Sequence, residues 1–87
     1  MMRIADETLA LWNDLLQQLP LPVRDSVRAA AELRAHQQAE ESGGALTEED
    51  GVRAFIAAVE PDLRANLRRT LDLHGIDSSE FDDLLNP

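Results

Sequence analysis

The 87-residue sequence contains no cysteine and no lysine, and only 3% of its residues are aromatic. The absence of cysteine excludes disulfides, thiol nucleophiles and cysteine-ligated iron–sulfur clusters. No apolar run approaches the roughly 18 residues that a membrane-spanning helix needs, and the start of the chain lacks the charged and apolar regions of a signal peptide. These absences lead us to expect a cytoplasmic protein with no membrane association.

The chain is strongly acidic. It contains eight arginines and 17 aspartates and glutamates, which gives a net charge of −9. A protein with this charge repels phosphate backbones unless a local basic patch overrides the field. We therefore expect a protein partner or self-association rather than nucleic acid. A chain of this length forms one domain that buries only about 60–65% of its unfolded surface, so that pairing as a dimer would add stability.

The apolar residues are mainly leucine and alanine, which predicts an all-α protein without strands. Apolar residues recur at helical spacing, and proline or glycine follows each segment. The pattern predicts a small orthogonal bundle of three to four helices plus a short C-terminal helical turn, with helices near 7–18, 22–41, 48–59 and 61–74. We divide the chain into a helical domain, 1–75, and an acidic C-terminal tail, 76–87, and we expect no internal repeat.

Cap residues mark several of these helix boundaries. Asp6 is expected to cap the first helix and Thr47 the third, each through a side-chain oxygen that accepts a hydrogen bond from a free backbone N–H. Gly75 suits the left-handed position after the fourth helix. The second helix has mostly alanine on its apolar face, so another helix should approach it closely. The first and third helices should supply the main core.

No arrangement of residues predicts catalysis, a cofactor or a metal site. The two histidines, His36 and His74, are far apart in the sequence without cysteine beside them, whereas a zinc site needs three or four ligands. The serines lie outside any nucleophile elbow, and Gly43 and Gly44 lack the lysine of a phosphate-binding loop. We therefore expect a protein that is not an enzyme and has no cofactor.

A helix-turn-helix-like DNA-binding regulator is an alternative, because two helices flank a glycine-containing connection. The recognition helix of such a regulator would start here with Glu48, Glu49 and Asp50. These carboxylates would meet bases and phosphates, where like charges lower the affinity. Protein interaction is therefore the preferred hypothesis.

The arginines provide the first candidates for partner binding. Arg24 and Arg28 lie four residues apart on the second predicted helix, and Arg68 lies on the fourth beside the apolar Leu67. These four residues are predicted to contact a partner. The alternative for the arginines is a solvated face with ordinary salt bridges to nearby acids.

The acidic tail provides the second group of candidates. Phe81, Leu84 and Leu85 follow the i, i+3, i+4 spacing of a docking helix, whose carboxylates would meet a basic rim on the partner. The alternative is that the tail folds back and completes a thin core. The sequence leaves both possibilities open.

One stretch, residues 12–58, also carries a family pattern. Its elements are a tryptophan-bearing entry, a proline–valine–arginine turn, an arginine and a glutamate on the next helix, and a threonine–glutamate cap. The residues that make up this pattern are Trp12, Leu19-Pro20-Leu21-Pro22-Val23-Arg24, Val27-Arg28, Glu32, Ala35 and Leu46-Thr47-Glu48-Glu49. The stretch resembles the helical module at the C-terminal end of the B subunit of light-independent protochlorophyllide reductase, which also occurs in small stand-alone proteins.

The resemblance implies a three-helix core with Arg24, Arg28 and Glu32 as a linked polar surface. It implies an accessory, lid-like role in which the module covers or docks onto a larger protein. It does not imply reductase activity, because that enzyme needs iron–sulfur clusters and a tetrapyrrole cavity built by much larger subunits. The sequence as a whole predicts a small acidic non-enzymatic module for protein interaction or an accessory role, with homodimerisation as one form of that interaction.

Overall fold

The computed structural model describes residues 5–44 and 46–86, and its regular elements are all helices. In chain order they are α1 (Asp6–Gln17), α2 (Leu21–Glu41), α3 (Glu48–Ala58), α4 (Pro61–Arg64), the 3₁₀ helix η1 (Ala65–Leu67), α5 (Arg68–Leu73), the 3₁₀ helix η2 (Ser78–Phe81) and α6 (Asp82–Leu85). The predicted all-α fold is confirmed. The fourth predicted helix is divided into α4, η1 and α5, and none of the described helices is long and apolar enough to cross a membrane.

The helix ends confirm two predicted caps and correct a third. Thr47 Oγ1 accepts a hydrogen bond from the N–H of Asp50 at 3.1 Å, and Gly75 has a φ of +76°. Ala5 rather than Asp6 is the N-cap of α1, without a side-chain hydrogen bond. Asp6 lies one position later, where its carboxylate faces the positive end of the helix dipole.

The main core lies between α1 and α3, as predicted. The ring centroids of Trp12 and Phe55 lie 5.9 Å apart, and both side chains are buried. The indole Nε1–H of Trp12 donates a hydrogen bond to the carbonyl of Gly51 at 3.1 Å. The largest side chain of α1 is therefore fixed to the backbone of α3, which satisfies its one polar group.

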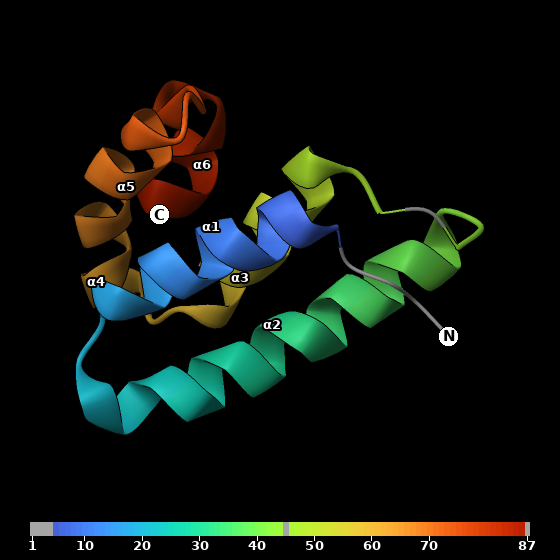
Figure 1. Ribbon diagram of the computed structural model, residues 1–87, viewed down its shortest axis with the longest axis horizontal. Coiled ribbons are helices and arrows are strands. Elements are labelled where there is room, and N and C mark those ends of the chain that lie inside the picture. The colour runs from blue at the N-terminus through green and yellow to red at the C-terminus, as the bar shows by residue number, and fades with distance from the viewer. Residues whose placement is uncertain (1–4, 45, 87) are drawn as a thin grey trace.

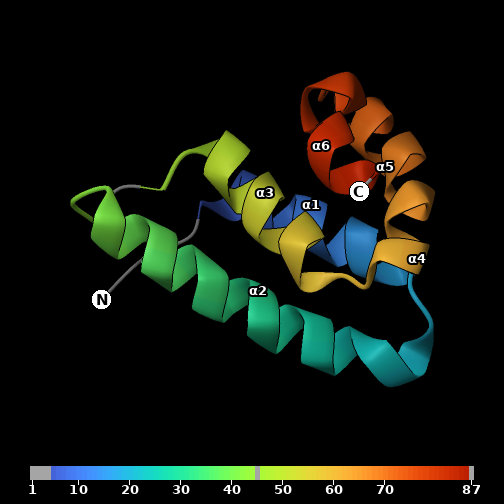
Figure 2. The same ribbon diagram turned by 180° about the vertical axis from the view of Figure 1, so that it is seen from behind.

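The alanines of α2 make the close helix contact that their size predicts. The buried residues of α2 recur every fourth position, and they are Val27, Ala31, Ala35 and Ala39. The most extensive contact between any two elements in the described residues is that of α2 with α3. Figures 1 and 2 show α2 running along one edge of the molecule and α3 returning antiparallel to it.

The contacts of two arginines show a structural repeat that residue identity does not reveal. Arg24 Nε donates to the carbonyl of Leu19 at 3.0 Å, and Arg64, forty positions later, donates in the same way to the carbonyl of Val59 at 2.8 Å. Each guanidinium also donates through Nη2 to a carbonyl seven residues earlier, at 3.3 and 3.4 Å. Each arginine thus satisfies carbonyls at the end of the helix that precedes its own.

Buried apolar positions recur at the same offset, in the pairs Leu15 and Phe55, Leu16 and Ile56, Leu19 and Val59, Val27 and Leu67, and Ala31 and Leu71. The two units are α1 with α2, and α3 with the helices from α4 to α5. The second helix of each unit packs on the first helix of the other, since α2 packs on α3 and α5 on α1. Few residues are identical between the units, so hydrogen bonding and burial reveal the repeat better than residue identity does.

Candidate functional site

The arginines predicted to bind a partner are engaged with their own chain. Arg24 is half-buried and bonds the carbonyls after α1, as described above. Arg28 donates to Asn13 Oδ1 at 3.4 Å and lies 3.8 Å from a carboxylate oxygen of Glu32. Arg68 lies 2.6 Å from Asp82. Arg24, Arg28 and Arg68 are thus each held by a different neighbour in the same chain.

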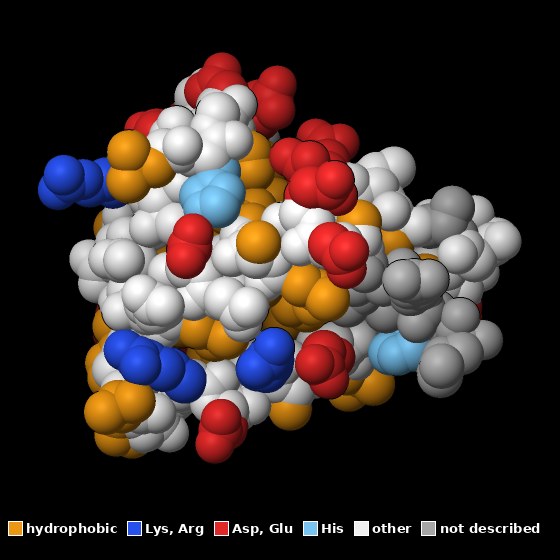
Figure 3. Space-filling view, viewed as in Figure 1, with side chains coloured by type: hydrophobic (Ala, Val, Ile, Leu, Met, Phe, Trp, Pro, Cys, Tyr) orange, Lys and Arg blue, Asp and Glu red, His pale blue; other side chains and the backbone are white. Residues whose placement is uncertain are grey.

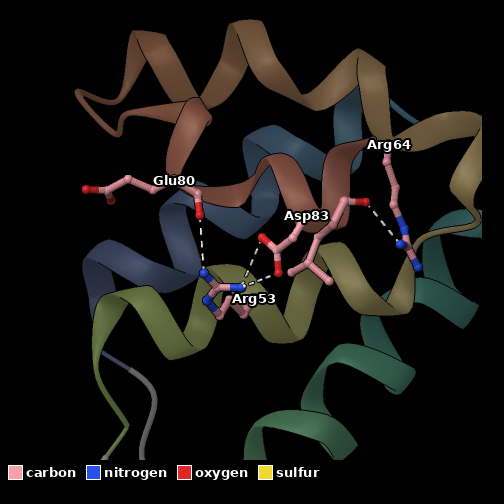
Figure 4. Close-up of polar contacts among 5 residues, drawn as sticks. Arg53, Arg64, Glu80 and Asp83 are labelled. Carbon is pink, nitrogen blue, oxygen red and sulfur yellow. Dashed lines mark hydrogen bonds and ion pairs between the residues drawn. The ribbon is translucent and has the colours of Figure 1, made fainter. Parts of the chain in front are cut away.

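Two further arginines hold the C-terminal segment in place, as Figure 4 shows. Arg53 Nη1 lies 3.2 Å from Asp83, Nη2 donates to the carbonyl of Glu80 at 3.2 Å, and the guanidinium lies 5.1 Å from the centroid of the Phe81 ring. Arg64 donates to the carbonyl of Leu84 at 3.1 Å. Within the described residues, five arginines therefore make contacts with their own chain, and three of them, Arg28, Arg53 and Arg68, pair with carboxylates.

The apolar residues predicted to contact a partner are mostly core residues. Leu67, Phe81 and Leu85 are 0%, 1% and 2% exposed, so they are not available to a partner while this fold is intact. The tail folds back against α3 and α4 because the rest of this small domain leaves their apolar surface uncovered. Of Phe81, Leu84 and Leu85, Leu84 alone is only partly buried, so its side chain has exposed surface that a partner could contact.

A hollow of about 300 Å³ lies where the start of α3 meets the turn after α5. Four carboxylates line it, and they are those of Glu48, Glu49, Asp77 and Glu80. Gly75, Ile76 and Phe81 complete the lining, and no basic side chain is among the described residues that line the hollow. We call this feature the acidic hollow.

Local chain geometry explains why these carboxylates meet. The Thr47 cap starts α3 with its carboxylates in the first turn, and the left-handed Gly75 reverses the chain after α5. Asp77 then caps η2, since its carboxylate accepts hydrogen bonds from Ser79 Oγ at 2.6 Å and from the Ser79 N–H at 3.0 Å. These two bonds lower the pKa of the Asp77 carboxyl below its ordinary value of 3.8.

Further acidic side chains lie on the surface near the acidic hollow, while Arg53 borders it at Glu80 and Phe81. On the face shown in Figure 3, acidic side chains gather over the turn after α5 and near the start of α3, whereas basic side chains lie mainly over the first half of α2. An arginine or lysine side chain fits such a site, because its aliphatic part can cover the apolar lining and its charge can reach several carboxylates. Among the described residues, no group of three or more histidines, cysteines or acids could hold a metal ion.

The sequence analysis did not predict the acidic hollow, because its carboxylates come from two segments that are far apart in the chain. The sequence places Glu48 and Glu49 at a helix start, and it leaves open whether the acidic tail docks on a partner or folds back onto the core. The Thr47 cap and the Gly75 turn are the sequence features that position these acids. Whether the acids lie close together, however, depends on how the tail packs.

Comparisons with family models, curated proteins and solved structures find no match to this chain.

Proposed function

We propose that this chain is a non-enzymatic interaction module that binds a basic segment of a partner protein at the acidic hollow. The observation that carries the proposal is the concentration of four carboxylates beside the apolar Ile76 and Phe81, on a chain whose net charge is −9. The positions of the arginines support it, because none of the described arginines is among the residues that line the hollow.

The expected affinity is modest and sensitive to salt. An exposed ion pair contributes about 0.2–1 kcal/mol, so that four pairs contribute at most about 4 kcal/mol, which corresponds to a dissociation constant on the order of 1 mM. Exposed charges are screened over about 8 Å at physiological ionic strength, and added salt should weaken the complex. A long-range acidic field would also speed the approach of a basic partner.

The accessory role implied by the reductase resemblance is a special case of this proposal, since covering a larger protein is also a protein–protein contact. The DNA-binding alternative receives less support. The carboxylates of Glu48, Glu49 and Asp50 lie in the first turn of α3, the helix that would have to enter the major groove.

A fluorescence-anisotropy titration tests the proposal with a short labelled peptide rich in arginine and leucine. A matched peptide with glutamate in place of arginine serves as the negative probe. We expect Glu49→Gln/Glu80→Gln to weaken binding of the basic peptide by about threefold to tenfold, because two ion pairs are lost. The matched control is Glu40→Gln/Glu60→Gln, which removes the same charge from two exposed positions outside the hollow.

The proposal fails if the basic peptide does not bind the wild-type chain at low salt. It also fails if the control pair weakens binding as much as the hollow pair does, because the overall charge rather than the hollow would then be responsible.

A further inference from the structure

The acidic tail contacts the rest of the fold in the way that one protein contacts another. We call residues 77–86 the tail segment; its η2 packs on α5, and its α6 packs on α3 and α4. Phe81 and Leu85 are 1% and 2% exposed and form the apolar part of this contact. The side chains of Asp82 and Asp83 lie at its edge, where they are 56% and 64% exposed. An apolar centre within a charged rim is the usual anatomy of a protein interface.

Three arginines supply the opposite side of this rim. Within the described residues, every hydrogen bond or ion pair between the tail segment and the rest of the chain involves Arg53, Arg64 or Arg68. Arg53 and Arg68 pair with the two rim carboxylates, and Arg64 donates to the carbonyl of Leu84. Figure 4 shows Arg53 and Arg64 reaching the tail segment from α3 and α4. The surface beneath the tail segment is therefore bordered by positive charge.

The tail segment keeps its shape only while it is seated on this surface. Its helices η2 and α6 have four residues each, far fewer than the roughly 12–15 that an isolated helix needs in water. Gly75 precedes the segment with a φ of +76°, and no described atom beyond its chain neighbours lies within 4 Å of where a Cβ would be. The turn is thus not clamped by packing. A short segment whose ion pairs lie in solvent opens locally at a lower cost than the whole fold.

We infer that the surface beneath the tail segment is a binding site for an acidic segment of a partner protein, and that the tail segment occupies this site as an intrachain ligand. The occupant that the structure shows defines the chemistry of the partner, since a competing segment has to make the same contacts. It needs a large apolar side chain in place of Phe81 and a second one four residues later in place of Leu85. Between them it needs carboxylates, as at Asp82 and Asp83, to meet the arginines of the rim.

Displacement of the tail segment would also change the acidic hollow. Asp77, Glu80 and Phe81 belong to the tail segment and line the hollow, so they leave it when the tail is displaced. An acidic partner beneath the tail therefore opposes a basic partner in the hollow, and each lowers the affinity for the other by the same factor. This coupling rests on the proposed function, whereas the binding site beneath the tail segment does not.

A labelled synthetic peptide of residues 77–86 serves as the acidic partner segment in fluorescence-anisotropy titrations with the full chain. In the wild type the peptide competes with the attached tail segment, whose effective concentration is of millimolar order. We therefore expect an apparent dissociation constant of about 1 mM or higher. In the Phe81→Ala chain the attached segment is weakened, while the peptide keeps its phenylalanine. The peptide should bind this chain at least about tenfold more tightly, because the apparent dissociation constant falls as the open fraction of the site rises.

A second variant makes the test independent of whether Phe81→Ala folds. Asp82→Asn/Asp83→Asn weakens the attached segment at its rim only and keeps both apolar anchors. Two exposed ion pairs are lost, so this chain should bind the unchanged peptide about threefold to tenfold more tightly than the wild type does. A peptide with Phe81→Ala and Leu85→Ala is the negative probe, and it should bind none of the chains.

Charge reversal in the Phe81→Ala chain tests the rim. Adding Arg68→Glu should weaken binding of the peptide by about threefold to tenfold, because its contact with Asp82 becomes repulsive. A peptide with Asp82→Arg should then bind this chain more tightly than the unchanged peptide does. The matched control is Arg69→Glu, the same charge change at the neighbouring, exposed position. It should leave the dissociation constant within about twofold, since exposed charges away from a contact are screened.

Three results would overturn the inference: a peptide that binds neither weakened chain, a peptide that binds the wild type as tightly as it binds them, or an Arg69→Glu effect as large as that of Arg68→Glu. Sedimentation equilibrium adds a fourth. Wild-type dimers that the peptide separates into monomers would place the tail of a second copy in the site instead of a partner. Failure of the basic peptide to bind the acidic hollow would refute the proposed function alone, because Glu48 and Glu49 take no part in the rim contacts.

Discussion

Replacing Gly51 by alanine tests the close packing of α1 against α3. Gly51 lies inside α3, where alanine would ordinarily be about 1 kcal/mol more favourable than glycine. In this fold, however, a Cβ added at Gly51 would lie 2.8 Å from Cγ2 of Thr8, which is shorter than real Cβ contacts. Thr8 is buried and β-branched, so its methyl group has little freedom to move away.

The two effects have opposite signs, and their sizes decide the outcome. Overpacking a tight helix contact costs about 1–3 kcal/mol, which exceeds the gain of about 1 kcal/mol in helix propensity. We therefore expect Gly51→Ala to lower the free energy of unfolding by about 1 kcal/mol. In a Thr8→Ser background the methyl group is absent and the hydroxyl is kept. There the same substitution should raise the free energy of unfolding by about 0.5–1 kcal/mol.

Thermal unfolding of the four proteins, followed by circular dichroism, measures this cycle. For a domain of this size, 1 kcal/mol shifts the Tm by about 4–8 °C. The expected shifts are therefore resolvable and of opposite sign in the two backgrounds. A rise in Tm for Gly51→Ala in the wild-type background would refute the contact, and so would an equal shift in both backgrounds.

Two further predictions concern hydrogen bonds within the chain. Arg64→Met should lower the free energy of unfolding by about 1–3 kcal/mol, as measured by urea denaturation. The loss should exceed that of Arg24→Met, because Arg64 makes an additional hydrogen bond to the tail. Equal losses for the two variants would contradict this. The bonds from Ser79 lower the pKa of Asp77 in the folded state. Their contribution to stability is complete above the ordinary pKa of 3.8 and is lost as the pH falls through the lower folded pKa. The Tm difference between the wild type and Asp77→Asn should thus shrink below about pH 4, and a difference that stays constant with pH would exclude the hydrogen bonds as its cause.

The helix boundaries were predictable because local rules determine them. Pro20 and Pro61 end the preceding helices by steric exclusion, and Gly75 supplies a left-handed turn at no steric cost. Thr47 caps α3 through its own side chain. Each of these effects acts within a few residues, so the sequence contains all that is needed.

The roles of the arginines were not predictable by the same rules. Spacing along one helix indicates which side chains can pair on that helix, and it correctly places Arg28 beside Glu32. Arg24 instead bonds a carbonyl five residues earlier, across the proline turn. That partner depends on the angle between two helices, which is set by the packing of their apolar faces rather than by residue spacing.

The apolar tail shows a similar limit. The spacing of Phe81 and Leu85 is the same in a docking helix and in a helix that completes its own core. What decides between them is whether the rest of the chain leaves an apolar surface uncovered, and both side chains are in fact buried. The acidic hollow follows from this outcome, because only a folded-back tail brings Asp77 and Glu80 beside the start of α3.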